Sequence, residues 1–171
     1  NVSTATSEQS IQMHQPSGYP TEMGKDILHL LPFKGEFLKP CPGTKAYICC
    51  GYQILNVATN CPLDCSYCIL QSYFHPPVLQ FFVNHEDLFA ELTRRLFHPQ
   101  IQRIGTGEFT DSLIWEVWSD LTSQIVARFA RQSHAVLELK TKTTAVKNLA
   151  TLDHNRKTIV SWSANTNAMI A

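Results

Sequence analysis

The sequence lacks any long apolar run, and no stretch of its 171 residues reaches the ~18 apolar residues that a membrane-spanning helix needs. The first thirty residues also lack a charged segment followed by an apolar one, which is the pattern of a secretory signal. Net charge is missing as well, because 14 Lys and Arg balance 14 Asp and Glu. We therefore expect a cytoplasmic protein with no membrane partner and no overall basic footprint for nucleic acid.

Internal repeats are absent too, so the chain is expected to form one domain, or part of one, with a buried core. Residues 1–26 are rich in Ser, Thr, Gln and Pro, a composition that favours a mobile or loosely packed lead-in. We expect this lead-in, partly disordered or loosely packed, to extend over residues 1–40. The domain that carries the chemistry is expected at residues 41–171.

The most informative feature present is the segment Cys61-Pro-Leu-Asp-Cys65-Ser-Tyr-Cys68. Three thiolates at this C-x3-C-x2-C spacing can hold three irons of a [4Fe–4S] cluster and leave the fourth iron open to a small molecule. The spacing predicts Cys61, Cys65 and Cys68 as the metal ligands. It also resembles the signature of radical SAM enzymes, whose open iron binds S-adenosylmethionine (SAM), and Tyr67 before the last cysteine agrees with that signature.

Other uses of these cysteines remain open at this point. A structural zinc site needs four ligands, so Cys49, Cys50 or His75 would have to complete it. The three thiols can also be inert. A disulfide framework is disfavoured because the chain is not small and the cysteines are too closely spaced. Cys49 and Cys50 are adjacent in a predicted strand, and we expect them to be buried free thiols.

Strands and helices alternate along the chain. Strands are predicted at residues 45–58, 101–104, 135–139 and 158–162, and helices at 84–97, 113–130 and 145–152. In the first helix Leu88, Leu92 and Leu96 recur every four residues, with Asn84 as the expected N-cap. This alternation predicts an α/β fold with a parallel sheet.

A polar segment follows each predicted strand. The cysteine loop follows the first strand, residues 105–112 the second, 141–143 the third and 163–165 the fourth. The carboxyl ends of parallel strands share one face, where ligands bind, so we expect these segments to form one site. The candidate partners for SAM in these segments are Glu108, Thr110, Lys142, Ser163 and Asn165.

Each of these loops also has an ordinary structural interpretation. Residues 105–112 can be a strand-to-helix turn with Asp111 as the N-cap. Lys142 can be a solvated surface lysine, and Ser163 and Asn165 can simply cap a turn.

Four segments in order make the sequence resemble the spore photoproduct lyase family of radical SAM proteins. They are the cysteine loop, Glu108-Phe-Thr-Asp-Ser-Leu113, Thr141-Lys142 and Ser161-Trp-Ser-Ala-Asn165, and the resemblance runs from about Cys41 to Ala171. It implies a partial (β/α)6 TIM-like barrel, with the cluster on Cys61, Cys65 and Cys68, and with Tyr67, Thr110, Lys142 and Ser163 near SAM. Only four strands are predicted, so we expect this chain to be the N-terminal portion of that barrel.

The resemblance also implies an activity. Spore photoproduct lyase is a carbon–carbon lyase that reverses a thymine dimer in spore DNA with a 5′-deoxyadenosyl radical and a cysteine hydrogen donor. DNA is the implied substrate, and flavodoxin or ferredoxin is an implied electron donor. The donor cysteine of the family lies in the loop after the second strand, whereas residues 105–113 contain no cysteine here and offer Glu108 or Phe109 instead.

Overall fold

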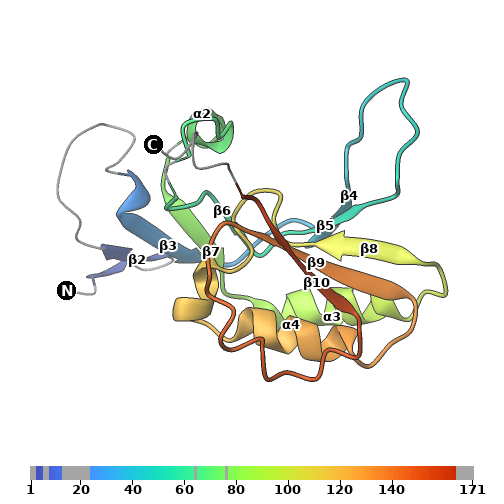
Figure 1. Ribbon diagram of the computed structural model, residues 1–171. Helices are drawn as coiled ribbons and strands as arrows, with labels where there is room; N and C mark the ends of the chain where they lie inside the picture. Colours follow the sequence, from blue (N-terminus) through green and yellow to red (C-terminus); the bar gives the residue numbers. More distant parts are fainter. Residues whose placement is uncertain (1–2, 6–7, 13–23, 64, 76, 165–171) are drawn as a thin grey trace.

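The computed structural model, which describes residues 3–5, 8–12, 24–63, 65–75 and 77–164, is built on two five-stranded sheets. The main sheet contains four parallel strands in chain order, with one antiparallel strand at its edge (Figure 1). Its strands are β4 (Leu38–Pro40), β5 (Gln53–Leu55), β8 (Gln102–Gly105), β9 (Ala135–Thr141) and β10 (Thr158–Trp162). The expected α/β fold with parallel strands is confirmed. The described residues do not form a closed barrel, and the partial (β/α)6 barrel stays a prediction.

The side sheet was not predicted from the sequence. It is ordered β1 (Ser3–Ala5), β2 (Glu8–Gln12), β3 (Ile27–Leu31), β7 (Leu79–Phe82) and β6 (Ala58–Thr59). Strands β3 and β7 are parallel, although some fifty residues separate them along the chain. Leu28 of β3 and Phe37 before β4 are buried in the core, at 4% and 2% exposure. Leu28 and Phe37 thus attach this part of the chain to the core, while the expected lead-in over residues 1–40 and the division of the chain at residue 41 stay predictions.

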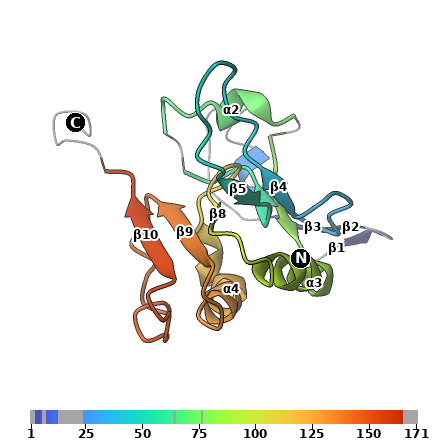
Figure 2. The same cartoon turned by 90° about the vertical axis from the view of Figure 1, so that its right-hand side faces the viewer.

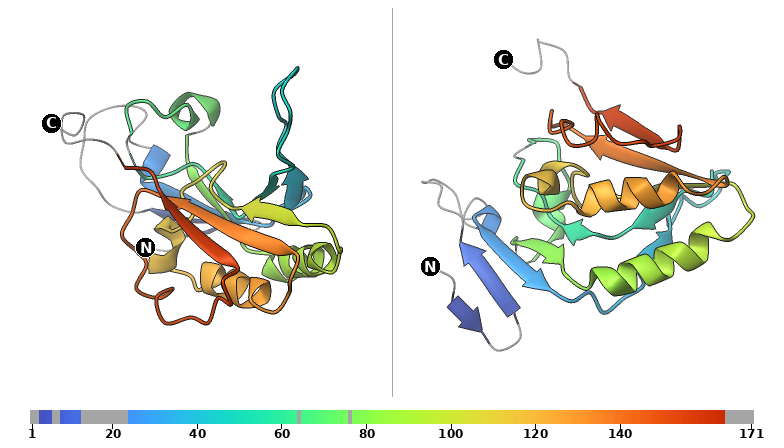
Figure 3. Two further views of the ribbon diagram at one scale, coloured as in Figure 1. Left: turned by 45° about the vertical axis from the view of Figure 1, so that its right-hand side comes forward. Right: turned by 90° about the horizontal axis from the view of Figure 1, so that it is seen from below.

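Two amphipathic helices, α3 (His85–Leu96) and α4 (Leu121–Phe129), cover one face of the main sheet (Figures 1 and 3). The short α2 (Leu70–Tyr73) lies on the other side of the molecule, beyond the sheet (Figure 2). None of the described helices has the length and apolarity to span a bilayer.

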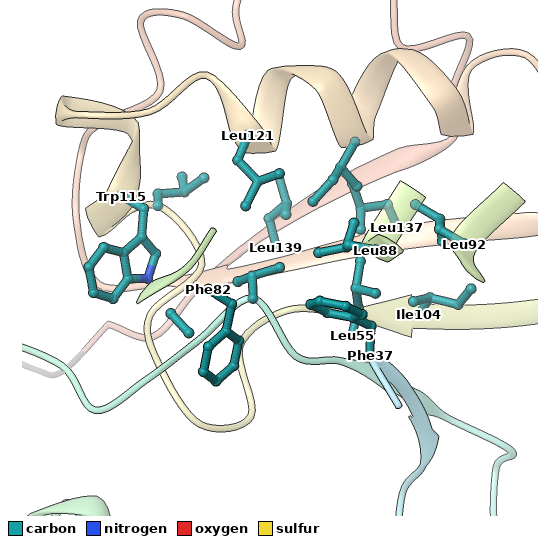
Figure 4. Close-up of a cluster of buried hydrophobic side chains, with 14 of the residues drawn as sticks. Phe37, Leu55, Phe82, Leu88, Leu92, Ile104, Trp115, Leu121, Leu137 and Leu139 are labelled. Carbon is teal, nitrogen blue, oxygen red and sulfur yellow. The ribbon is translucent and has the colours of Figure 1, made fainter. Parts of the chain in front are cut away.

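The core lies between the main sheet and its two helices (Figure 4). The predicted leucine stripe of α3 is fully buried: Leu88 and Leu92 are 0% exposed. Leu137 and Leu139, alternate residues of β9, face the helices and are also 0% exposed. Burying such side chains stabilises each by roughly 1.5–3 kcal/mol, so this layer holds the strand ends in place.

The helix predicted at 84–97 and the strands predicted at 101–104, 135–139 and 158–162 are confirmed to within two residues at each end. Helix α3 begins after Asn84 as expected, but the Asn84 side chain makes no cap. It bonds the backbone N–H and C=O of Phe33 instead, at 2.8 and 3.1 Å. Asn84 therefore joins this helix to the segment after β3.

The strand predicted at 45–58 is largely wrong. Only β5 and β6 form there, because Ala46 and Gly51 adopt left-handed backbone angles (φ 69° and 71°) that interrupt an extended chain. The segment before β5 is a loop that projects from the molecule (Figure 1). Cys49 and Cys50 lie in this loop and are exposed, not buried as we expected.

Two predicted helices also differ from the structure. The 113–130 helix is divided into a 3-10 turn, η1 (Ile114–Val117), and α4, because the Ser119 hydroxyl accepts the Leu121 N–H and starts a new helix. Residues 145–152 form turns instead of a helix. A segment this short gains too few backbone bonds to offset helix nucleation.

Candidate active site

A pocket of about 320 Å³ lies at the carboxyl ends of the parallel strands. Its lining comes from the cysteine loop, the loop after β8, the end of β9 and the segment after β10. The lining residues are Cys61, Leu63, Cys65, Tyr67, Cys68, Ile69, Leu70, Gly107, Glu108, Thr110, Asp111, Lys140, Thr141, Lys142 and Ser163. The expected convergence of the polar segments is therefore present, and the volume is within the range of small-molecule sites, roughly 300–1,000 Å³.

Asn165 is the one predicted site residue that lies outside the described residues. The roles assigned to the other site residues stay predictions.

The cysteine loop is fixed at its start by Asn60. This residue has a left-handed φ of 66°, a conformation that Asn tolerates better than most residues. Its side-chain oxygen accepts the Cys61 N–H at 2.8 Å, and its amide donates to the carbonyls of Pro77 and Val78 at 2.9 and 3.3 Å. Asn60 thus ties the beginning of the loop to its end and sets the position of Cys61.

A tight turn sets the other two cysteines. The Cys68 N–H donates to the Cys65 carbonyl at 2.9 Å, and the Gln71 side-chain amide donates to the same carbonyl at 2.8 Å. Both thiols are partly exposed, whereas Cys61 is buried. The loop therefore presents two accessible sulfurs and one shielded sulfur to the same pocket.

The electrostatic environment of Cys61 favours the neutral thiol. Burial raises the pKa of Cys61 to about 11, and the charges of Asp111 and Cys65 add to the increase. The backbone N–H groups of Leu63 and Asp111 hydrogen-bond the sulfur and lower this pKa in part. These two N–H groups belong to different loops. Both would partly balance the negative charge of a Cys61 thiolate, whether or not a metal is bound.

Asp111 joins three parts of the site. One carboxylate oxygen accepts the Leu113 N–H and the Thr141 hydroxyl at 2.9 and 2.8 Å, and the other accepts the Lys142 N–H at 2.7 Å. Its own N–H is one of the two donors to Cys61. Asp111 is 8% exposed, so these bonds are shielded from water. It was considered from the sequence only as a helix N-cap, yet it fixes the loop after β8 to the end of β9.

The remaining predicted residues take distinct positions. The Lys142 ammonium lies 5.7 Å from the centre of the Tyr67 ring, so the loop after β9 contacts the cysteine loop. Thr110 is buried, and its oxygen accepts the Trp115 indole N–H at 3.1 Å, which leaves its hydroxyl hydrogen to donate. Glu108 and Ser163 are exposed at the pocket.

The donor set agrees in type with an iron–sulfur cluster. In the described part of the chain, no three His, Cys, Asp or Glu side chains gather closely enough to hold a single metal ion. A [4Fe–4S] cube makes a different demand, because each thiolate binds its own iron and the sulfurs need not meet at one point. Three thiols on one pocket are compatible with the cube.

A second pocket, of about 470 Å³, has a different character. Its lining residues are Leu28, Leu30, Phe81, Val83, Trp115, Trp118 and Ser119. These side chains include no thiol, carboxylate or cation, so the reactive groups belong to the pocket at the strand ends.

Asn60 and Asp111 are the functional positions that the sequence did not assign. The Asn60-Cys61 pair, with Asn directly before the first cysteine, was a usable signal for a left-handed turn. Asp111 offered no comparable signal, because its partners Thr141 and Lys142 lie some thirty residues away.

Comparison with known proteins agrees with this geometry. The structure is similar to spore photoproduct lyase complexed with dinucleoside spore photoproduct, with a TM-score of 0.75, 22% identity, and coverage of 88% of this chain and 43% of that chain. A mutant spore photoproduct lyase with bound AdoMet and dinucleoside spore photoproduct gives a TM-score of 0.76, 22% identity, and coverage of 91% and 46%. At this identity the likeness concerns the fold, and the chain spans less than half the length of these structures.

No curated protein sequence matches the chain. The model of the family described as spore photoproduct lyase, however, matches residues 48–171, which is most of the chain. That stretch contains the cysteine loop and every other described residue of the pocket. The chain therefore belongs to the spore photoproduct lyase family.

Proposed function

We propose that this chain forms the cofactor-binding part of a radical SAM enzyme. Cys61, Cys65 and Cys68 would hold a [4Fe–4S] cluster, and SAM would occupy the pocket beside it. The observation that carries the proposal is one pocket that gathers the three thiols with polar groups from three other strand ends. Family membership supports it independently.

When bound, the cluster supplies the electron that cleaves SAM to methionine and a 5′-deoxyadenosyl radical. The chain's own residues bind and orient the cofactors. The Lys142 ammonium would pair with the SAM carboxylate, while the Thr110 hydroxyl and Ser163 would donate hydrogen bonds to SAM. Asp111 would hold the backbone of Lys142 close to Cys61 through its contacts with both. Glu108 would accept a hydrogen bond from the amino group of SAM.

For the substrate we propose a thymine photoproduct in DNA, repaired by carbon–carbon bond cleavage. Solved family members bear a dinucleoside spore photoproduct, which supports this choice. Residues 105–113 contain no cysteine, so the hydrogen donor would come from outside that loop. An external protein such as flavodoxin or ferredoxin would deliver the electron.

The cluster is tested by anaerobic reconstitution of the wild-type chain and two variants. We expect one oxygen-sensitive [4Fe–4S] cluster in the wild type and its loss in Cys65→Ala, since two thiolates cannot hold the cube. Cys49→Ala is the matched control, because Cys49 is an exposed thiol on the projecting loop. Iron, sulfide and zinc analysis give the readout. Full iron binding in Cys65→Ala, or a colourless zinc protein, would contradict the assignment.

Binding of SAM is tested by titration of cluster-loaded protein, monitored through the electron paramagnetic resonance spectrum. Lys142→Ala should weaken binding about ten- to a hundredfold, the equivalent of roughly 1.5–3 kcal/mol for a charge-assisted bond. Ser163→Ala should cost less, about 0.5–1.5 kcal/mol. Neither change should lower the iron content. Equal SAM affinity in all three proteins would show that Lys142 is a solvated surface lysine that does not bind SAM.

A further inference from the structure

Three side chains from separate segments meet on the main sheet, on the face turned away from α3 and α4. They are Tyr52, just before β5, Arg103 of β8 and Lys140 of β9. The Arg103 guanidinium lies 4.8 Å from the centre of the Tyr52 ring, and the Lys140 ammonium lies 5.0 Å from the same ring. We call these three residues the cation platform.

The ring of Tyr52 is held in place by the sheet beneath it. A side chain at Gly105 would overlap the Tyr52 hydroxyl, so glycine at this position leaves the space that the ring occupies. Tyr52 is only 6% exposed, whereas both cations are exposed. The ring therefore serves as a support that keeps two cations apart and presents them to solvent.

Only one of the two cations of the platform forms an ion pair within the described residues. One Glu138 carboxylate oxygen lies 3.6 Å from the Arg103 Nε, and the other accepts the Ser161 hydroxyl at 3.1 Å. Arg103 also donates to the Cys50 sulfur at 3.7 Å. Among the described residues, no carboxylate lies within ion-pair distance of the Lys140 ammonium. Glu108 is a second carboxylate, close enough for its charge to raise the pKa of Tyr52, but no ion pair joins it to Arg103 or Lys140 within the described residues. Lys140 is therefore available to an anion.

The platform is continuous with the candidate active site, because Lys140 also lines the 320 Å³ pocket. An anion on the platform would sit beside the molecule held in that pocket. Arg and Lys together suit the oxygens of a phosphate group, the guanidinium through paired N–H donors and the ammonium as a point charge. The chain has no net charge, so the meeting of these two cations is not a consequence of a basic overall composition.

We propose that the cation platform binds a phosphodiester of the substrate and so positions a dinucleotide step next to the active-site pocket. This inference rests on the proposed function, since it assumes that the substrate is a nucleotide chain. It assigns to Arg103 and Lys140 a role in substrate binding that is separate from the SAM contacts of Lys142 and Ser163.

The test measures equilibrium binding of a fluorescently labelled thymidine dinucleotide with one phosphodiester, at fixed low salt because such contacts are salt-dependent. The comparison probe is the same dinucleotide with a neutral methylphosphonate linkage. Arg103→Gln and Lys140→Gln should each weaken binding of the charged probe about tenfold. Arg103→Lys should recover part of the loss. Lys147→Gln, which removes an exposed lysine from the turns before β10, should bind like the wild type.

The neutral probe should bind equally weakly to every variant. Equal affinity of the wild type for both probes, or unchanged binding in Arg103→Gln and Lys140→Gln, would overturn the inference. So would a Lys140→Gln variant that loses SAM affinity while it keeps the dinucleotide. Thermal unfolding of each variant excludes misfolding as the cause. Dinucleotide binding that depends on Arg103 and Lys140 in a chain that takes up neither cluster nor SAM would uphold the inference and refute the proposed function.

Discussion

The two faces of the main sheet are made by the same strands but have opposite chemistry. On β9, Leu137 and Leu139 face the helices and are 0% exposed, while the residues that alternate with them, Glu138 and Lys140, face the open side. Successive side chains of a strand point to opposite faces, so a single seven-residue strand supplies both surfaces. The helix-covered face stabilises the fold, and the open face is left free for charged groups that would be costly to bury.

The largest expected effect comes from a cavity on the helix-covered face. Leu137→Ala removes a fully buried side chain between β9 and the helices and should lower the free energy of unfolding by about 2–5 kcal/mol. Lys140→Ala, three residues along the same strand but on the open face, should change it by less than about 0.5 kcal/mol. Urea unfolding followed by circular dichroism measures both. Equal losses of unfolding free energy in the two variants would show that the helix-covered face does not stabilise the fold more than the open face does.

The helix-covered face was largely predictable from the sequence, and the reason is local periodicity. Leu88, Leu92 and Leu96 give the helical repeat of α3, and β9 shows strict alternation over residues 137–140. Each pattern lies within one element, so no knowledge of distant residues is needed to recognise it. The family resemblance supplied the order of the site segments, and the structure brings residues from all four of them to one pocket.

The side sheet and the projecting loop were not predictable in the same way. Strand β3 pairs with β7, which follows the cysteine loop, and that pairing depends on contacts between residues some fifty positions apart. Residues 45–52 are rich in apolar and aromatic types and so looked like a strand. Their left-handed angles at Ala46 and Gly51, not their composition, decide the outcome.

A smaller effect on stability is expected at Asp111, which joins the loop after β8 to the end of β9. In the wild type, the Lys142 N–H donates to an Asp111 carboxylate oxygen at 2.7 Å. Asp111→Asn places an N–H₂ group opposite this N–H, and the bond is lost. Leaving that buried donor without an acceptor should cost about 1–3 kcal/mol of unfolding free energy. Urea unfolding provides the measurement.

Asp120→Asn is the matched control, because Asp120 is exposed and its carboxylate accepts a hydrogen bond from the side chain of Gln124, one turn along the same helix. Its stability should stay within about 0.5 kcal/mol of the wild type. A loss in Asp120→Asn as large as that in Asp111→Asn would show that Asp111 has no special part in joining the loops.

The smallest effect concerns the protonation of Tyr52 on the open face. Burial is the largest cause that raises the pKa of Tyr52 to about 12; the charges of Glu138 and Glu108 act in the same direction, and the charge of Arg103 acts against them. The pKa of a tyrosine in the unfolded chain is about 10, so folding favours the neutral phenol of Tyr52. This contribution to stability is present below pH 10 and is lost as the pH rises from about 10 to 12.

The pKa of Tyr52 is measured from the absorbance of the phenolate. Subtracting the absorbance of the matching Tyr52→Phe variant from that of each protein isolates the signal of this residue. Glu138→Gln should lower the pKa, since one raising cause is removed while burial remains, and Arg103→Gln should raise it. Shifts in the opposite directions, or a Tyr52 pKa at the ordinary tyrosine value of about 10, would mean that the ring is not enclosed between the sheet and the two cations. The open face would then lack the fixed support on which the cation platform depends.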